Sequence, residues 1–95
     1  MSNTAERVHT DQAQIARLQA RVKELQDETV VELRLVDGTI VTGVVAVRPS
    51  VQIFRDAEGR EGTNAYVRID DQVQPERWQY IWLDQIDNVT RLGSA

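Results

Sequence analysis

The dipeptide Asp37-Gly38 separates two short segments, residues 29–35 and 39–47, in which apolar and polar residues alternate. Alternation with a period of two predicts half-buried strands, and Asp-Gly between two such strands is among the strongest short-range signals of a β-hairpin. A type I′ turn needs positive φ at both central residues, which these two residue types tolerate, so we expect that turn here. An antiparallel hairpin therefore lies at the centre of the predicted fold.

A second glycine, Gly43, lies inside the second of these strands. Glycine weakens the interior of a strand, so its presence indicates a bend, a bulge or a close approach of another backbone. A small and strongly curved barrel contains such positions. Pro49 then ends the strand, because proline has no N–H to donate to a ladder.

The segment before the hairpin predicts an α-helix over residues 10–28. Its apolar residues fall on one stripe at helical spacing, namely Ile15, Leu18, Val22 and Leu25. We interpret the stripe as the face that packs on the core, and a short coiled coil is the alternative. Residues 1–9 are polar and are predicted to form a flexible tail.

Further short strands are predicted downstream, at residues 51–55, 65–69, 78–83 and 86–92. Residues 56–62 and 70–77 are turn-rich and are predicted to be loops. A chain of 95 residues makes a single domain. The predicted fold class is mainly β: an N-terminal helix followed, over residues 29–92, by a small, strongly bent antiparallel barrel of five or six strands.

The composition argues against several classes of function. The chain has no cysteine, which excludes a thiolate site, and its one histidine, His9, lies in the predicted tail, where no general base can be held in place. We therefore expect no catalytic residue, no cofactor and no metal, and we interpret the carboxylates of Asp56, Glu58 and Glu61 as a solvated loop. A net charge of −4 disfavours broad attraction to nucleic acid. No apolar run suggests a signal or a membrane span, so a cytoplasmic protein without membrane contact is expected.

The order and spacing of these elements resemble the Sm/LSm-like proteins, which include the bacterial Hfq-type RNA chaperones. The first family motif matches as Leu35-x-Asp37-Gly38, four residues, and Gly43-x-Val45, and the stretch YIWLDQIDNV resembles the second motif. The resemblance implies a helix lying on a bent five-stranded barrel. It also implies that residues 56–78 are an enlarged loop between the third and fourth strands, with room for an extra strand or hairpin. An SH3-like barrel with a different strand order is the alternative fold.

The uridine pocket of that family does not carry over to this chain. The resemblance implies that Pro49 and Ile53 stand where an aspartate and an asparagine usually hold the base. The family's arginine-glycine-asparagine turn, or the tyrosine-lysine-histidine of the Hfq type, aligns with Trp82, Leu83 and Asp84. Only Trp82 keeps an aromatic plane, so we predict that this pocket is lost.

The strand WQYIWL has three aromatic residues, Trp78, Tyr80 and Trp82, on one face and no charge. These aromatic side chains are interpreted as core packing, as a protein interface or as a platform for stacking bases. With Ile81 and Asp84 they form the candidate interaction surface. Sm-like proteins close rings by pairing this strand with the last strand of a neighbour, so the resemblance implies a homo-oligomer.

The function predicted from the sequence is a non-catalytic interaction and oligomerisation module, with itself or another protein as partner. The alternative is an RNA-binding Sm-like protein with a non-standard site.

Overall fold

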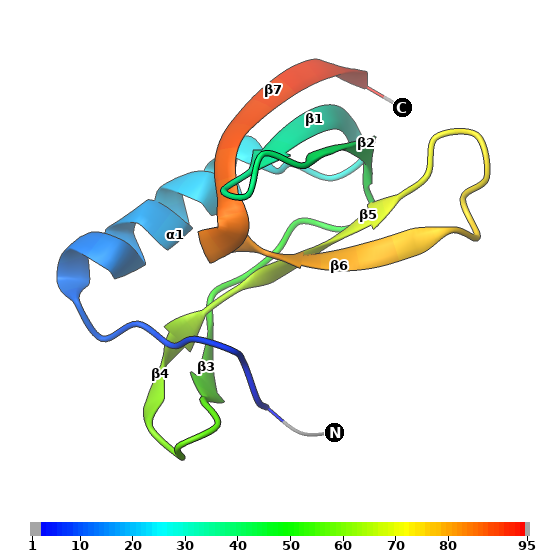
Figure 1. Cartoon of the computed structure of the whole chain (residues 1–95). Helices are drawn as coiled ribbons and strands as arrows, with labels where there is room; N and C mark the ends of the chain where they lie inside the picture. The colour runs from blue at the N-terminus through cyan, green and yellow to red at the C-terminus, as the bar shows by residue number, and fades with distance from the viewer. Residues whose placement is uncertain (1–2, 95) are drawn as a thin grey trace.

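The computed structural model describes residues 3–94, which form one helix, seven strands and a short 3₁₀ turn (Figure 1). In chain order the elements are α1 (Gln12–Glu24), β1 (Thr29–Leu35), β2 (Ile40–Val45), β3 (Gln52–Arg55), β4 (Glu61–Asn64), β5 (Tyr66–Asp70), β6 (Trp78–Trp82), η1 (Leu83–Gln85) and β7 (Ile86–Ser94). Five strands form a sheet in the order β6-β5-β2-β1-β7, and β3 pairs with β4 in a second, smaller sheet.

The predicted class is confirmed: a helix precedes a set of antiparallel strands in a strongly bent sheet. The five-stranded sheet is not closed, because β6 and β7 form its two edges and do not pair with each other. Within residues 3–94, no helix has the length and apolar character needed to cross a bilayer.

Helix α1 is shorter than the predicted range of 10–28. Asp11 is its N-cap, and the carboxylate accepts the backbone N–H groups of Ala13 at 2.7 Å and Gln14 at 3.4 Å. The helix ends at Glu24 because the chain must turn back towards β1, and Glu28 adopts a positive φ of 59° in that turn.

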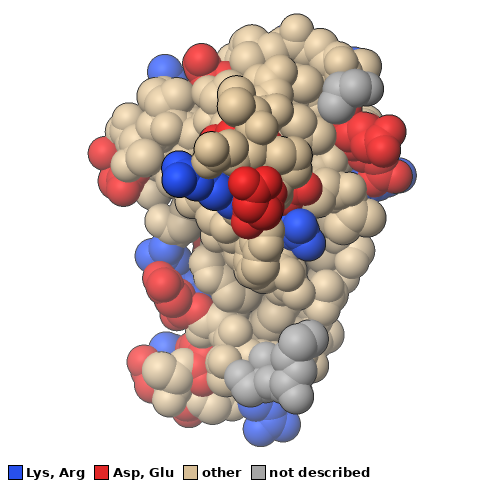
Figure 2. Space-filling model, turned by 90° about the vertical axis from the view of Figure 1, so that its right-hand side faces the viewer, with Lys and Arg blue, Asp and Glu red and all other residues tan. Residues whose placement is uncertain are grey.

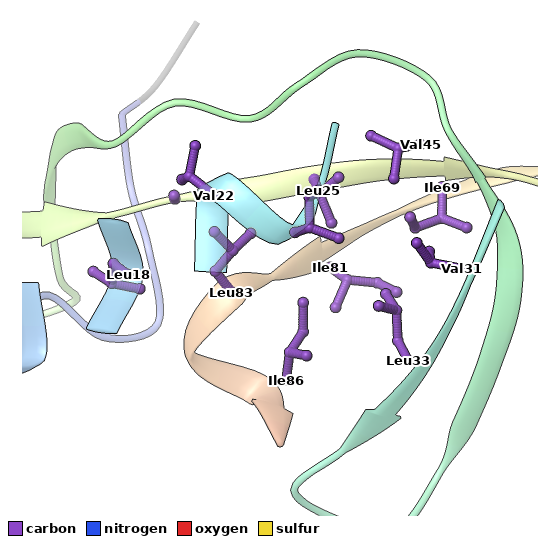
Figure 3. Packing of buried hydrophobic residues seen from close by; sticks show 12 residues of the cluster. Leu18, Val22, Leu25, Val31, Leu33, Val45, Ile69, Ile81, Leu83 and Ile86 are labelled. Atoms are coloured by element: carbon purple, nitrogen blue, oxygen red, sulfur yellow. The ribbon is translucent and has the colours of Figure 1, made fainter. Parts of the chain in front are cut away.

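The apolar stripe of α1 packs on the sheet (Figure 3). Leu25 and Leu33 are fully buried at the centre of this core. The side chains around them come from the helix, from all five strands of the large sheet and from η1. They are Leu18, Val22, Val31, Val45, Val67, Ile69, Ile81, Leu83 and Ile86. Leu18, Val22 and Leu25 of the stripe therefore pack in the chain's own core, as the main interpretation predicted, whereas Ile15 is only half-buried.

The turn between β1 and β2 differs from the predicted type I′ turn. Gly38 has a φ of 89°, but Asp37 is not among the residues with positive φ. The Gly38 N–H donates to the Leu35 carbonyl at 2.9 Å, and the Leu35 N–H donates to the Thr39 carbonyl at 2.8 Å. These bonds are typical of a three-residue loop in which the glycine takes the left-handed position.

Gly43 lies where strand β5 passes closest to β2. A Cβ atom at this position would lie 2.6 Å from Ile69 Cγ2 and closer still to the Asp70 carbonyl oxygen. The strands β2 and β5 pair only over Val44 with Asp70 and Val45 with Ile69. The glycine therefore allows the backbone approach that joins the two halves of the sheet.

A strand does form within the predicted range 51–55, as β3, but the prediction that it is the third strand of the barrel sheet is wrong. β3 pairs with β4, whereas β2 pairs with β5, so the chain runs out through β2 and β3 and returns through β4 and β5 as one long, broken hairpin (Figure 1). The predicted enlarged loop, residues 56–78, accordingly contains two strands and two turns. The strand Glu61–Asn64 escaped prediction because it is short and polar and contains a glycine.

Each of three hairpin turns, β1–β2, β3–β4 and β5–β6, is fixed by an aspartate. The Asp56 carboxylate accepts the Arg60 N–H at 2.9 Å, and the Asp71 carboxylate accepts the Gln74 N–H at 2.9 Å. These backbone hydrogen bonds lower the pKa of Asp56 and Asp71 below the ordinary value, and a bond from Thr39 does the same to the pKa of Asp37.

Candidate functional site

The segment before the helix lies against the hairpin of β3 and β4, and we call residues 3–9 the strap. The Ala5 N–H donates to the Arg55 carbonyl at 2.9 Å, and at the other end of the strap His9 and Thr63 exchange two backbone hydrogen bonds of 2.8 and 2.7 Å. Ala5 is buried at 7% exposure. The prediction of a flexible tail over residues 1–9 is therefore wrong for residues 3–9, and residues 1 and 2 lie outside the described residues.

The strap passes over Gly62 in strand β4. A Cβ atom on Gly62 would lie 2.9 Å from both Val8 Cβ and the His9 carbonyl oxygen. The two backbones approach closely only because this position has no side chain.

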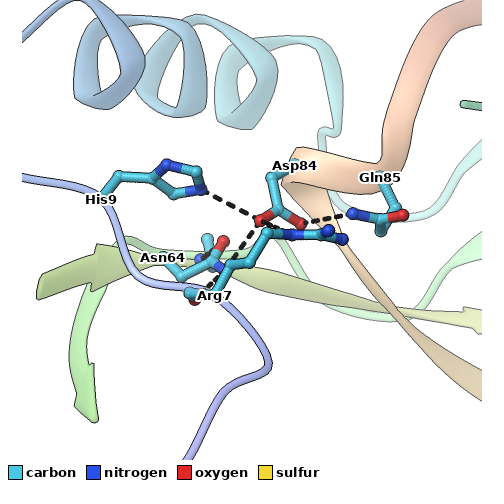
Figure 4. Close-up of polar contacts among 6 residues, drawn as sticks. Arg7, His9, Asn64, Asp84 and Gln85 are labelled. Atoms are coloured by element: carbon cyan, nitrogen blue, oxygen red, sulfur yellow. Dashed lines mark hydrogen bonds and ion pairs between the residues drawn. The ribbon is translucent and has the colours of Figure 1, made fainter. Parts of the chain in front are cut away.

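A cluster of polar side chains fastens the strap to the turn between β6 and β7 (Figure 4). The Asp84 Oδ2 atom lies 3.0 Å from His9 Nε2 and accepts hydrogen bonds from Arg7 Nε at 3.4 Å and Asn64 Nδ2 at 3.2 Å. Gln85 Nε2 donates to the other carboxylate oxygen at 3.3 Å. Asp84 is thus shared among donors from the strap, the hairpin and its own turn, and its side chain is only 11% exposed.

Asn64 lies at the bottom of this cluster with 1% exposure. Its Nδ2 atom also donates to the Arg7 carbonyl at 2.8 Å, and its Oδ1 atom accepts the Ala65 N–H at 2.8 Å. One amide side chain therefore connects the strap, the hairpin and η1. The sequence did not predict a role for Asn64, because Arg7 and Asp84 lie far from it along the chain.

His9 is not the solvated tail residue that the sequence predicted, since its side chain is 18% exposed and faces Asp84. An aspartate that orients a histidine also occurs in catalytic sites, but those sites add a nucleophile or a bound water that the histidine activates. Here Asp84 is occupied by Arg7 and Asn64 as well. These contacts hold the strap to the turn between β6 and β7. Among residues 3–94, no three histidine or carboxylate side chains gather as metal ligands.

An open groove of about 660 Å³ lies beside this cluster, between α1 and η1. Three arginines and three carboxylates line it: Arg7, Arg17, Arg21, Glu24, Asp84 and Asp87. Arg21 bonds to Glu24 at 2.7 Å and also donates to the Ile86 carbonyl at 3.3 Å. The positive charge in the groove is therefore largely balanced.

The five aromatic side chains of the protein form a continuous row. Cross-strand pairing sets Tyr66 opposite Trp82, with 5.5 Å between ring centroids, and Phe54 packs edge-on against Trp82 at 5.2 Å. Tyr80 lies 5.0 Å from Tyr66 and 5.2 Å from Trp78. Edge-to-face contacts of this kind stabilise a sheet face beyond the area they bury.

The two ends of the aromatic row differ in exposure. Phe54 is buried at 4%, whereas Trp78 is 49% and Tyr80 57% exposed, and the Arg68 guanidinium lies 4.8 Å from the Trp78 ring centroid. The row thus combines core packing at one end with an exposed aromatic surface at the other.

The five residues of the candidate interaction surface do not all meet. Trp78, Tyr80 and Trp82 belong to the aromatic row, but Ile81 points to the opposite face and is buried in the core. Asp84 belongs to the polar cluster that holds the strap. Sequence reasoning missed Phe54 and Tyr66, which join the row only through pairing between strands.

Comparisons with known proteins agree with this architecture. The family model described as "Domain of unknown function (DUF3247)" matches residues 2–92. Among solved structures, the chain is similar to XC5848 from Xanthomonas campestris, whose crystal structure is described as adopting a novel variant of Sm-like motif. The two chains are 43% identical with a TM-score of 0.87, over 95% of this chain and 97% of that one. The search of curated proteins gave no match.

The long hairpin and the open sheet both fit a variant of the Sm architecture. With a match over nearly the whole chain, the protein belongs to the family described as Domain of unknown function (DUF3247) and has an Sm-like fold.

Proposed function

We propose that the protein is a non-catalytic, cytoplasmic Sm-like module that associates with copies of itself by pairing β6 of one subunit with β7 of the next. The observation that carries the proposal is that β6, the strand Trp78–Trp82, forms one edge of the sheet and has no charged residue. Exposed edge strands are usually defended by charge, proline or a covering segment. β7 forms the other edge, and its two charged residues, Asp87 and Arg91, leave most of its length open to pairing.

The direction of the β6 backbone groups identifies which residues face the free edge. The Leu83 N–H donates to the Ala65 carbonyl, and the Arg77 carbonyl accepts the Asp71 N–H. The backbone groups of residues 77 and 83 therefore point towards β5 and its ends. Backbone groups alternate along an antiparallel strand, which turns those of Gln79 and Ile81 towards β5 as well. The N–H groups of Trp78, Tyr80 and Trp82 therefore point away from the sheet.

This geometry supplies a direct test, the substitution Tyr80→Pro. Proline removes an outward N–H, and edge strands tolerate proline when that N–H faces solvent. We expect the wild-type protein to have a mass in solution well above the 10.8 kDa of one chain, and Tyr80→Pro to return it towards that mass. Size-exclusion chromatography with light scattering measures both, and circular dichroism checks that the variant is folded.

The matched control is Tyr80→Ala, which removes the same ring but keeps the backbone donor. Equal loss of assembly in both variants would show that the ring, and not edge pairing, holds the subunits together. A wild-type mass of one chain at micromolar concentration refutes the proposal. Ile81→Pro is a poor probe, because it would break the β5–β6 ladder and disturb a residue that is only 5% exposed.

RNA binding is the second candidate function, and the groove between α1 and η1 favours it, because Arg7, Arg17 and Arg21 all line that groove. Against it stand the carboxylates of the same groove and the net charge of −4. On the face shown in Figure 2, acidic and basic side chains are intermixed. Nucleic-acid binding usually needs a concentrated basic surface.

Fluorescence anisotropy with uridine-rich and adenine-rich RNA decides between the two functions. We expect only weak binding, with no preference between the two RNAs and no loss on Arg17→Ala. Submicromolar affinity that falls steeply between about 50 and 200 mM salt, and that Arg17→Ala reduces, would establish RNA binding instead.

A further inference from the structure

A second groove, of about 540 Å³, lies on another side of α1, where the helix faces the segment between β2 and β3. We call it the proline groove. It is lined by Gln19, Val22, Lys23, Arg48, Pro49, Ser50 and Val51. Val22, Pro49 and Val51 supply aliphatic lining between the helix and the segment, and the surface of the groove is mainly apolar. Its size is within the range of about 300–1,000 Å³ that is typical of ligand sites.

The two charged residues that line the proline groove are both cations. Lys23 comes from the last turn of α1 and Arg48 from the facing segment, and both side chains are exposed. Neither forms an ion pair or a side-chain hydrogen bond within the part of the chain that the structure describes, and no carboxylate lines the groove. The nearby Asp27 carboxylate accepts the Arg48 backbone N–H, which fixes the segment to the end of the helix and leaves the guanidinium free.

We propose that the proline groove binds a short acidic peptide segment of a partner protein, with apolar side chains against Val22, Pro49 and Val51 and carboxylates on Lys23 and Arg48. Two unpaired cations at the rim of an aliphatic groove complement a segment in which acidic and apolar residues alternate. Elsewhere on the described surface several arginines pair with carboxylates, as Arg60 does with Asp56 and Arg34 with Asp87.

A peptide fits this chemistry better than a nucleic acid does. No aromatic side chain lines the groove, so bases would find no stacking surface. Two cations in a protein of net charge −4 also provide little attraction for a polyanion, whereas two or three carboxylates on a short peptide match them.

The experiment measures binding of a fluorescein-labelled hexapeptide in which leucine alternates with aspartate, by fluorescence anisotropy with the full chain. We expect saturable binding, weakened at least about tenfold in the double variant Lys23→Glu, Arg48→Glu, because both charge-assisted hydrogen bonds are lost. A hexapeptide with serine in place of leucine is expected to bind as weakly as the double variant does, since it offers no apolar side chains.

The matched control is Arg17→Glu, which reverses a charge on the same helix but lies outside the proline groove. Retained binding in this variant, with loss in the double variant, supports the site. The proposal is overturned by an absence of saturable binding, by equal loss in Arg17→Glu, or by equal binding of a peptide with lysine in place of aspartate. Displacement of the peptide by a single-stranded RNA would also overturn it in favour of a nucleic-acid site.

Discussion

Replacing Gly43 with alanine is expected to destabilise the protein by at least about 3 kcal/mol, at the top of the range for overpacking. The added Cβ would lie 2.6 Å from Ile69 Cγ2 and against the Asp70 carbonyl, and a carbonyl in a paired strand cannot rotate away as a flexible side chain does. Strand β5 must therefore move from β2, which breaks the short ladder between Val44 and Asp70 and between Val45 and Ile69. Equilibrium unfolding in urea, followed by circular dichroism, measures the loss.

The control is Thr42→Ala, one residue away on the exposed face of the same strand. It changes the local sequence without adding an atom towards β5, so its effect on the free energy of unfolding should stay well below that of the glycine variant. If Gly43→Ala were as stable as the wild type, the close crossing of β2 and β5 could not exist as described.

Asn64→Ala is expected to destabilise the folded protein by about 2–4 kcal/mol, because buried groups that lose their partners carry most of the penalty. The variant removes the three hydrogen bonds of the Asn64 amide. The Ala65 N–H and the Arg7 carbonyl lose their partner, and Asp84 loses one donor. The strap should loosen before the core does. We therefore expect trypsin to cleave after Arg7 much faster in the variant, under conditions in which residues of α1 stay protected.

Asn88→Ala is the matched control, since Asn88 is exposed on β7 and, among residues 3–94, its side chain bonds to Thr90 alone, at 3.3 Å. Its unfolding midpoint and its rate of cleavage after Arg7 should stay close to those of the wild type. Unchanged stability and unchanged cleavage in Asn64→Ala would show that the cluster around Asp84 does not hold the strap.

The features that the sequence predicted are those that neighbouring residues determine. The Asp37-Gly38 turn, the stripe of α1 and the unusual Gly43 each leave a mark within a few residues, and the fold class follows from their order. The strap leaves no such mark, because its hydrogen bonds join residues fifty or more positions apart. The strand Glu61–Asn64 leaves none because it is short and polar and contains a glycine.

The same limit applies to the candidate site. The alternation of WQYIWL was enough to place three aromatic residues on one face, but Phe54 and Tyr66 reach that face through pairing that the sequence does not encode locally. His9 looked like a tail residue because its partner, Asp84, stands 75 residues away.

The strap has a consequence for the time course of folding. During synthesis, the residues that bind the strap are added long after the strap itself, since the hydrogen bond from Arg7 to Asp84 spans 77 residues. Contacts that close such long loops form late, after the local hairpins and the helix have already lost their conformational freedom. The strap should therefore dock last and detach first, as the least stable cooperative unit of the chain. In a newly made chain the strap would lack its contacts to Asp84 until the turn after β6 has formed, and the edges of β3 and β4 that it covers would be more open to other strands for that interval.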